Sequence, residues 1–205
     1  MYTMGKRLRF SWLFLFVFAI ILFCPGCEEE EKILDQFTGE RIGLVLNIPE
    51  YSDAFYYQAQ LETALINYID RNYDLEVVNP RLFLKRKPQW EGQLPEFCRD
   101  ELGLDYLLTI DLESVVINEP NPRMDLRAQS FKFKLITTCS LSLAYTFENL
   151  NTGGILYYGQ SNGSSRKENE VKVGESGVRF DIEGPNYYDL IENAMFHALY
   201  RTGLL

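Results

Sequence analysis

The clearest hydrophobic pattern in the chain is a strict alternation of apolar and polar residues between positions 131 and 147. A period of two predicts a long antiparallel strand with one buried face and one solvent-exposed face. The segment ENLNTGG then predicts a turn into a hairpin partner over residues 155–164. The positions of the face predicted to be buried are Phe131, Phe133, Leu135, Thr137, Cys139, Leu141, Leu143, Tyr145 and Phe147.

The pattern before this hairpin predicts a strand, a helix and a second strand. Residues 42–48 alternate as a strand that stops at Pro49, because proline has no N–H for a sheet ladder. Ser52 or Asp53 is placed to cap a helix whose apolar residues recur at helical spacing until Asn72. The segment DLEVVNP then predicts a second, short strand.

The remaining elements complete an α+β (α/β-like) fold. A short helix is predicted over residues 94–102, a third strand over 104–117, and a last helix after Asn186, with a stripe of apolar residues on one side. The order β-α-β-α-β-β-β-α predicts a single mixed sheet with helices packed on it and a C-terminal helix, in one domain over residues 41–205.

Three segments interrupt these patterns. Residues 81–93 are basic and contain proline, which predicts a surface loop. The sequence NEPNPR at 118–123 predicts a break after the third strand. Residues 164–185 are charged and glycine-rich, and two interpretations stay open: a mobile excursion, or a weak extra hairpin.

The N-terminus has the layout of a secretory signal. Residues 10–23 carry no charge and follow Lys6, Arg7 and Arg9. Gly26 precedes Cys27, and this junction resembles the lipobox of bacterial lipoproteins, although Cys24 stands where leucine is usual.

The lipobox resemblance implies a signal peptide over residues 1–26 and a covalent lipid, such as palmitate, on Cys27; an uncleaved N-terminal anchor and an ordinary secretory cut stay open as alternatives. It also implies a location in the bacterial cell envelope, anchored to a membrane, favouring the outer membrane, with the domain facing the periplasm. An acidic tether is then expected over residues 27–40. A CxxC metal or redox site is disfavoured, because the cysteine pair abuts the apolar run and has no second ligand pair.

Net charge narrows the class of partner. The full chain has a formal charge of −9, and without residues 1–26 it keeps 17 basic and 29 acidic residues, a charge of −12. This acidity argues against nucleic acid as a partner, because nucleic-acid binding depends on basic patches that neutralise phosphate.

Four segments carry a resemblance to a family of envelope modules. The segments are RIGLVLNIPE, LETALINYIDRNYDLEVVNPRLF, ELGLDYLLTIDLESV and LSLAYTFENLNTGGILYYGQSNGSS. They resemble the curli-secretion lipoproteins (CsgG-type), the activators of penicillin-binding proteins (LpoB-type) and the N-terminal domain of the Tol-system propeller protein. The resemblance spans about residues 41–200, and Asn149 and Asn151 stand where that family often has aspartate. It implies a mixed sheet and no catalytic motif.

Candidate chemistry is sparse, and no catalytic residue, metal ligand set or cofactor is predicted. His197 is the single histidine and is interpreted as a helix-surface or boundary residue. Asp105, Asp111 and Glu113 share one parity along the third strand, and we interpret them as a solvent-facing or helix-flanked face rather than a paired-carboxylate site.

Two cysteines remain after Cys27. Cys98 and Cys139 are either a disulfide, since an exported protein meets oxidising conditions, or two buried thiols, and we favour the thiols.

Partner-binding candidates lie in the two charged segments. The first set is Lys85, Arg86, Lys87 and Trp90, a basic and aromatic patch in an acidic protein, and the second is Arg166 and Lys167.

The leading hypothesis is a lipid-anchored, non-enzymatic envelope protein that binds, assembles or regulates a protein partner in secretion, envelope assembly or cell-wall synthesis. A homo-oligomer stays open. The alternatives are a lipopolysaccharide-assembly or lipid-handling lipoprotein and, third, an envelope hydrolase.

Overall fold

The computed structural model describes residues 32–90, 92–127, 130–174, 177–180 and 186–205. Their strands form one mixed sheet of six strands in the order β2-β1-β3-β4-β5-β6. Strand β1 pairs in parallel with β2 and β3, and the pairs β3–β4, β4–β5 and β5–β6 are antiparallel. The α+β class and the single mixed sheet predicted from the sequence are therefore confirmed. The strands are β1 (Arg41–Asn47), β2 (Glu76–Val78), β3 (Tyr106–Arg127), β4 (Ser130–Asn149), β5 (Gly154–Gly174) and β6 (Gly177–Phe180).

Helices pack on both faces of the parallel part of the sheet. Leu44 and Leu46 of β1 belong to the large cluster that contains the apolar stripes of α2 and α5, whereas Val45 belongs to a second cluster with Cys98 of α4. Because successive side chains of a strand point to opposite faces, β1 is covered from both sides. The helices are η1 (Ile33–Phe37), η2 (Asp53–Tyr57), α2 (Gln58–Asn72), α3 (Pro80–Leu84), η3 (Pro88–Trp90), α4 (Leu94–Asp100) and α5 (Tyr187–Arg201).

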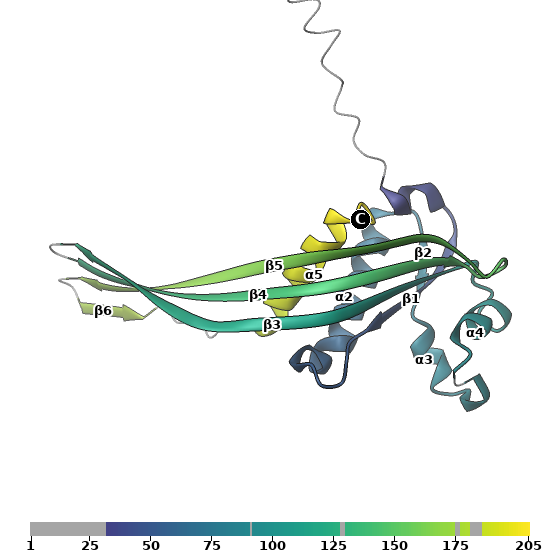
Figure 1. The fold of residues 1–205 in the computed structure, drawn as a ribbon, viewed down its shortest axis with the longest axis horizontal. Coiled ribbons are helices and arrows are strands. Elements are labelled where there is room, and N and C mark those ends of the chain that lie inside the picture. The colour runs from purple at the N-terminus through teal and green to yellow at the C-terminus, as the bar shows by residue number, and fades with distance from the viewer. Residues whose placement is uncertain (1–31, 91, 128–129, 175–176, 181–185) are drawn as a thin grey trace, which may run out of the picture. The chain divides into compact units, whose positions relative to one another are not determined.

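The alternating pattern of residues 131–147 does form a strand, β4, and its apolar residues from Cys139 to Phe147 lie in the cluster that contains the apolar stripe of α5. Leu141, Leu143, Tyr145 and Phe147 are buried in the large cluster. Helix α5 approaches β5 so closely that a Cβ on Gly163 would lie 1.8 Å from the carbonyl oxygen of Ala194. Beyond the helices, β3, β4 and β5 continue together as a long arm that ends near β6 (Figure 1).

The break predicted at NEPNPR is wrong. Strand β3 runs through these residues to Arg127, with an irregular register between Asn118 and Asn121. The last residue of β3 that pairs with β1 is Asp111. Beyond it β3 is an edge strand, which pairs with β4 on one side and with no described strand on the other. A proline that lacks an N–H is tolerated on such an edge, and a bulge absorbs the misfit.

Three other segments differ from the prediction or decide between alternatives. Residues 81–93 are not only a loop, because α3 and η3 lie there. Helix α3 begins at Pro80, which is well suited to the first turn, and the side chain of Asn79 caps it by accepting a hydrogen bond from the Arg81 N–H. For residues 164–185, the extra hairpin is the interpretation that holds, since β5 continues to Gly174 and pairs with β6.

The acidic tether does not extend to residue 40. Residues 33–37 form η1, whose Leu34 is fully buried and whose Phe37 packs edge-on against Phe147 at 4.6 Å between ring centroids. Acidic composition predicted a solvated segment, but Leu34 and Phe37 supply enough apolar surface to fix it on the core.

Candidate functional site

A hollow lies beside the carboxyl end of β1. Strand β2 pairs only with Arg41–Gly43, so the later residues of β1 have no strand partner on that side. Here a groove of about 550 Å3 opens between β1, α2 and α3. Open sheets with parallel strands commonly bind ligands outside the carboxyl ends of those strands. The groove is lined by Asn47, Ile48, Glu50, Phe55, Tyr56, Gln58, Ala59, Glu62, Thr63, Asn79, Arg81, Leu82 and Lys85.

Two side chains of α2 replace the missing strand partner. The Gln58 amide nitrogen donates to the Leu46 carbonyl oxygen at 2.8 Å, and the Leu46 N–H donates to Glu62 Oε1 at 3.0 Å. Gln58 and Glu62 are four residues apart, so they lie on the same side of the helix. The polar backbone groups of β1 are therefore satisfied without a second strand, which leaves room for the groove.

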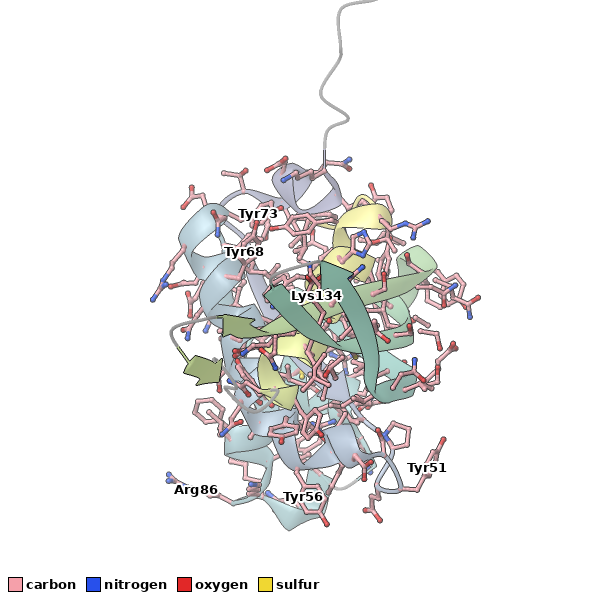
Figure 2. All side chains as sticks on the ribbon, turned by 90° about the vertical axis from the view of Figure 1, so that its left-hand side faces the viewer. Tyr51, Tyr56, Tyr68, Tyr73, Arg86 and Lys134 are labelled. Atoms are coloured by element: carbon pink, nitrogen blue, oxygen red, sulfur yellow. The ribbon has the colours of Figure 1, made fainter. Side chains whose placement is uncertain are left out.

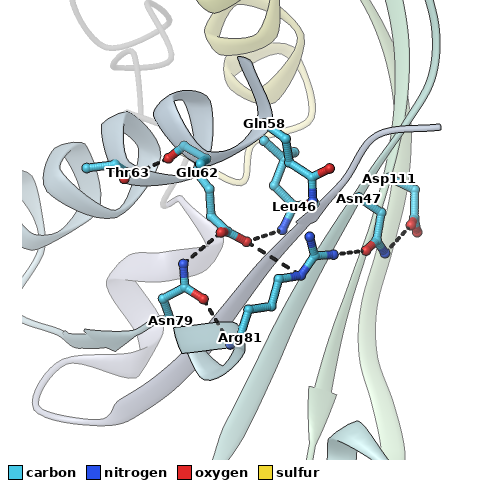
Figure 3. Close-up of polar contacts among 9 residues, drawn as sticks. Leu46, Asn47, Gln58, Glu62, Thr63, Asn79, Arg81 and Asp111 are labelled. Atoms are coloured by element: carbon cyan, nitrogen blue, oxygen red, sulfur yellow. Dashed lines mark hydrogen bonds and ion pairs between the residues drawn. The ribbon is translucent and has the colours of Figure 1, made fainter. Parts of the chain in front are cut away.

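Glu62 also fixes the floor of the groove. Its side chain is 6 % exposed, accepts a hydrogen bond from the Asn79 side-chain amide at 2.7 Å, and lies 3.9 Å from Nε of Arg81. Asn79 in turn accepts a hydrogen bond from the Arg81 backbone N–H at 3.0 Å. Figure 3 shows Glu62 between Asn79 and Arg81, with the guanidinium turned toward β1. A buried carboxylate thus holds one arginine in a defined position.

The network continues from α3 across β1 to β3. Nη2 of Arg81 donates to the Asn47 side-chain oxygen, and the Asn47 amide donates to Asp111 at 2.7 Å (Figure 3). Of the three acidic residues singled out from the sequence, Asp105 precedes β3 and accepts a hydrogen bond from Asn151, whereas Glu113 of β3 meets Gln160. Asp105, Asp111 and Glu113 therefore each contact a different amide side chain.

Exposed apolar side chains border the groove. Phe55, Tyr56 and Leu82 line it, and Tyr56 and Leu82 are 87 % and 62 % exposed. We call these three residues the apolar rim. Tyr51 and Phe83, close to them in the chain, are exposed as well. Figure 2 shows Tyr51, Tyr56 and Arg86 at one end of the domain, away from Tyr68 and Tyr73 at the other.

The first set of predicted partner-binding residues is divided by the structure. Lys85 lines the groove and Arg86, next to it, is exposed. Lys87 is half-buried and forms an ion pair with Glu101. Trp90 is half-buried and packs against Phe97 of α4, with 6.0 Å between ring centroids. Of these four side chains, only Lys85 lines the groove.

Arg166 and Lys167 lie elsewhere, on β5, where they pair in register with Thr138 and Thr137 of β4. Arg166 forms an ion pair with Glu168 at 2.7 Å. In the sheet, β3 and β4 separate this strand from β1, so neither residue lines the groove. The two sets of candidates therefore do not form one surface.

His197 is an exposed residue of α5, as predicted. Its Nδ1 lies 3.3 Å from the Ser164 backbone nitrogen and accepts a hydrogen bond from it at the open edge of β5. Unpaired edges invite association with other strands, and this contact covers part of the edge. The residue has a structural partner and lines no hollow among those described.

Both internal cysteines are free, buried thiols in the structure. Cys98 and Cys139 belong to separate hydrophobic clusters, on opposite faces of the sheet. Burial raises the pKa of the Cys98 thiol to about 12 and that of Cys139 to about 11. Cys27, the predicted lipidation site, lies outside the described residues.

Two further findings concern metals and membranes. Within the described ranges, no group of three or more histidine, cysteine, aspartate or glutamate side chains is placed to hold a metal ion. Among the helices of the same ranges, none has the length and apolar character needed to span a membrane.

The residues that build the groove floor, Glu62, Asn79, Arg81 and Asn47, were not singled out from the sequence. A signal was present, because Gln58 and Glu62 fall at helical spacing with the buried Leu65 and Ile69. A charged residue at a core position of a helix is rarely left without a partner. The partners themselves come from α3, which is too short to show a period.

Comparison with known proteins gives neither a family nor a curated relative: no family profile matches the chain, and no curated protein does. Solved structures do match. A neuraminyllactose-binding haemagglutinin homologue from Helicobacter pylori is 15 % identical, with 80 % of each chain covered and a TM-score of 0.40. Lipoprotein GNA1162 from Neisseria meningitidis is 11 % identical, with 77 % of this chain and 95 % of that chain covered and a TM-score of 0.40.

The C-terminal domain of LpoB from Escherichia coli is 13 % identical, with 62 % of this chain and 83 % of that chain covered and a TM-score of 0.41. With TM-scores near 0.4 and identities of 11–15 %, none of these three structures assigns the chain to a family or gives it a function.

Proposed function

We propose that this protein is a lipid-anchored, non-enzymatic module of the bacterial cell envelope that binds a protein partner through the groove beside β1. The observation that carries the proposal is the combination of a hollow of about 550 Å3 with the apolar rim and exposed basic residues at its border. Aromatic residues and arginine are enriched at protein interfaces, where a few such anchors provide most of the binding energy.

The position of the groove fits an anchor at Cys27. Four residues separate Cys27 from Lys32, the first described residue, so the chain between them spans at most roughly 18 Å. The Lys32 ammonium group lies 5.9 Å from the Tyr73 ring, at the end of the domain opposite Tyr56 and Arg86 (Figure 2). A lipid on Cys27 would hold that end toward the bilayer and leave the groove facing a periplasmic partner.

Photo-crosslinking in cells tests the groove. A photoreactive amino acid replaces Tyr56 in one variant and Tyr158, which is 60 % exposed on β5, in the matched control. We expect one envelope protein to be captured at position 56 and not at 158, and the adduct to disappear when Leu82 is changed to serine. Equal capture at both positions, or none at position 56, would contradict the proposal.

The anchor is tested separately by changing Cys27 to alanine. We expect the variant to lose its acyl chain, detected by mass spectrometry of the mature N-terminus, and to leave the membrane fraction. Normal processing and continued membrane association of this variant would show that the anchor is placed wrongly. Homo-oligomerisation stays a prediction, which light scattering of the mature domain tests.

Lipid handling is a second candidate, favoured by a smaller hollow of about 370 Å3 between η2 and α5. Its lining is more aromatic and aliphatic than the groove floor, with Tyr57, Ile117, Tyr187 and Ile191 among its residues. If this is the function, delipidated protein will bind a fluorescent fatty acid, and changing Ile191 to glutamate will abolish that binding. Absence of fatty-acid binding by the wild-type protein would eliminate the candidate.

A further inference from the structure

Arg81 has hydrogen-bonding capacity that the network around it does not use. Its Nε faces Glu62 and its Nη2 donates to Asn47, whereas its Nη1 donates to none of the described residues. The side chain is 31 % exposed and lines the groove. A guanidinium fork that is held on one side and open on the other is preorganised to bind an anion.

Lys85 adds a second cation at the same place. Lys85 is the C-cap residue of α3 and follows Arg81 by four residues, so the two side chains lie on the same side of the helix. Both line the groove. Glu62 balances much of the Arg81 charge, but among the described residues Lys85 forms no ion pair.

We infer that the groove recognises an acidic segment of the partner protein, with a carboxylate bound between Arg81 and Lys85 and a neighbouring apolar side chain packed on the rim. The inference rests on the proposed function and names the chemistry of the partner. The groove lining carries two cations, Arg81 and Lys85, and two carboxylates, Glu50 and the buried Glu62, so the charge complementarity is local. It comes from Lys85, which forms no ion pair among the described residues, and from the exposed part of the Arg81 guanidinium. The formal net charge of −9 disfavours adsorption to anionic lipid headgroups as the use of this site.

Shape and chemistry agree with a peptide carboxylate rather than an isolated anion. Nη1 of Arg81 donates to none of the described residues, so it is the guanidinium nitrogen that remains for a peptide carboxylate oxygen. Phe55, Tyr56 and Leu82 would remain in contact with water if only a small anion were bound. A residue such as leucine or phenylalanine next to the acidic residue would cover them.

Nuclear magnetic resonance titration with two short peptides tests this recognition. The probes are Ac-Leu-Glu-Phe-NH2 and its neutral analogue Ac-Leu-Gln-Phe-NH2, added to the 15N-labelled mature protein. We expect the glutamate peptide to shift the Arg81 Nε–Hε signal and the backbone signals of Tyr56 and Lys85, and to bind about tenfold more tightly than the glutamine peptide.

Variants separate charge recognition from folding. Lys85→Gln changes an exposed side chain, so we expect an intact fold and a preference for the glutamate peptide reduced severalfold. In the double variant Glu62→Gln with Arg81→Gln, both charges are removed while hydrogen-bonding groups remain, and the preference should vanish. Arg71→Gln, at the far end of α2, is the matched control and should keep the full preference.

The outcomes distinguish the inference from the proposed function. If both peptides bind the groove equally, carboxylate recognition is wrong while docking in the groove stands. The inference is overturned if the glutamate peptide does not perturb the groove signals. It is also overturned if phosphatidylglycerol vesicles bind in a Lys85-dependent way and the peptide does not bind. Capture of a partner at position 56 is measured independently, so its failure would instead contradict the proposed function.

Discussion

Replacing Glu62 with leucine tests whether this buried carboxylate holds the groove together. The change removes the acceptor of the Leu46 N–H and of the Asn79 amide, and leaves Arg81 without its acidic partner. Leucine is close to glutamate in size, so the effect reports lost polar interactions more than a cavity.

The size of the effect follows from these contacts. An unsatisfied buried N–H costs about 1–3 kcal/mol, and breaking a buried ion pair by removing one partner costs about 3–5 kcal/mol. Arg81 is 31 % exposed, so water compensates part of its loss, and we expect a decrease of about 3 kcal/mol in the free energy of unfolding. For a chain of this size, that corresponds to a fall in Tm of roughly 10 °C.

Urea unfolding followed by circular dichroism measures the loss, with two comparison variants. Glu62→Gln keeps one acceptor oxygen, so we expect it to cost about 1–2 kcal/mol. Asp70→Leu changes an exposed residue of the same helix and should stay within about 0.5 kcal/mol of the wild type. If Glu62→Leu costs less than about 1 kcal/mol, or no more than Glu62→Gln, then the carboxylate does not organise this site.

Three further predictions concern packing, pH and the rim. Gly163→Ala should cost about 1–3 kcal/mol, because its Cβ would overlap a carbonyl oxygen of α5, whereas Gly154→Ala should be nearly neutral in the same chemical-denaturation measurement. Burial raises the pKa of Cys98 to about 12 and of Cys139 to about 11, from an ordinary value of 9.0. The thiols of the unfolded chain therefore ionise first, so their contribution to stability should be full below pH 9 and fall as pH rises toward 11. Urea midpoints that fall with pH no more steeply than those of the double alanine variant would contradict this. Tyr56→Ser should leave stability within about 0.5 kcal/mol and abolish partner capture at a neighbouring crosslinker, so retained capture would exclude the rim as an anchor.

Local patterns in the sequence were sufficient for most of the fold. Alternation over residues 131–147 identified β4, and helical spacing identified α2 up to Asn72, because a strand or helix that faces a core repeats its apolar residues with its own period. The prediction of a break at residues 118–123 was wrong, because prolines interrupt a central strand but are tolerated in an edge strand. Whether a strand lies at an edge depends on its neighbours, which the local sequence does not contain.

The site was less accessible to sequence reasoning than the fold. Lys85 and Arg86 were identified as partner candidates from their charge in an acidic chain; Lys85 lines the groove, and Arg86 is exposed next to it in the chain. Lys87 and Trp90 had the same signal, but Lys87 forms an ion pair with Glu101, the C-cap residue of α4, and Trp90 packs against Phe97 of α4. Composition selects residue types that favour contact, but it does not say which of them the neighbouring helix covers.

By itself, the sequence determined the class of fold, the order of most elements and the acidic character of the chain, because periodicity and charge are properties of neighbouring residues. Only the tertiary structure decided that β2 pairs with no residue of β1 beyond Gly43, that Gln58 and Glu62 bond the backbone of β1 further on, and that Glu62 positions Arg81 at the floor of a groove. These contacts join residues 12 to 64 positions apart. They depend on how the backbone brings distant segments together, and a buried charge acquires its partner only when the whole domain has folded.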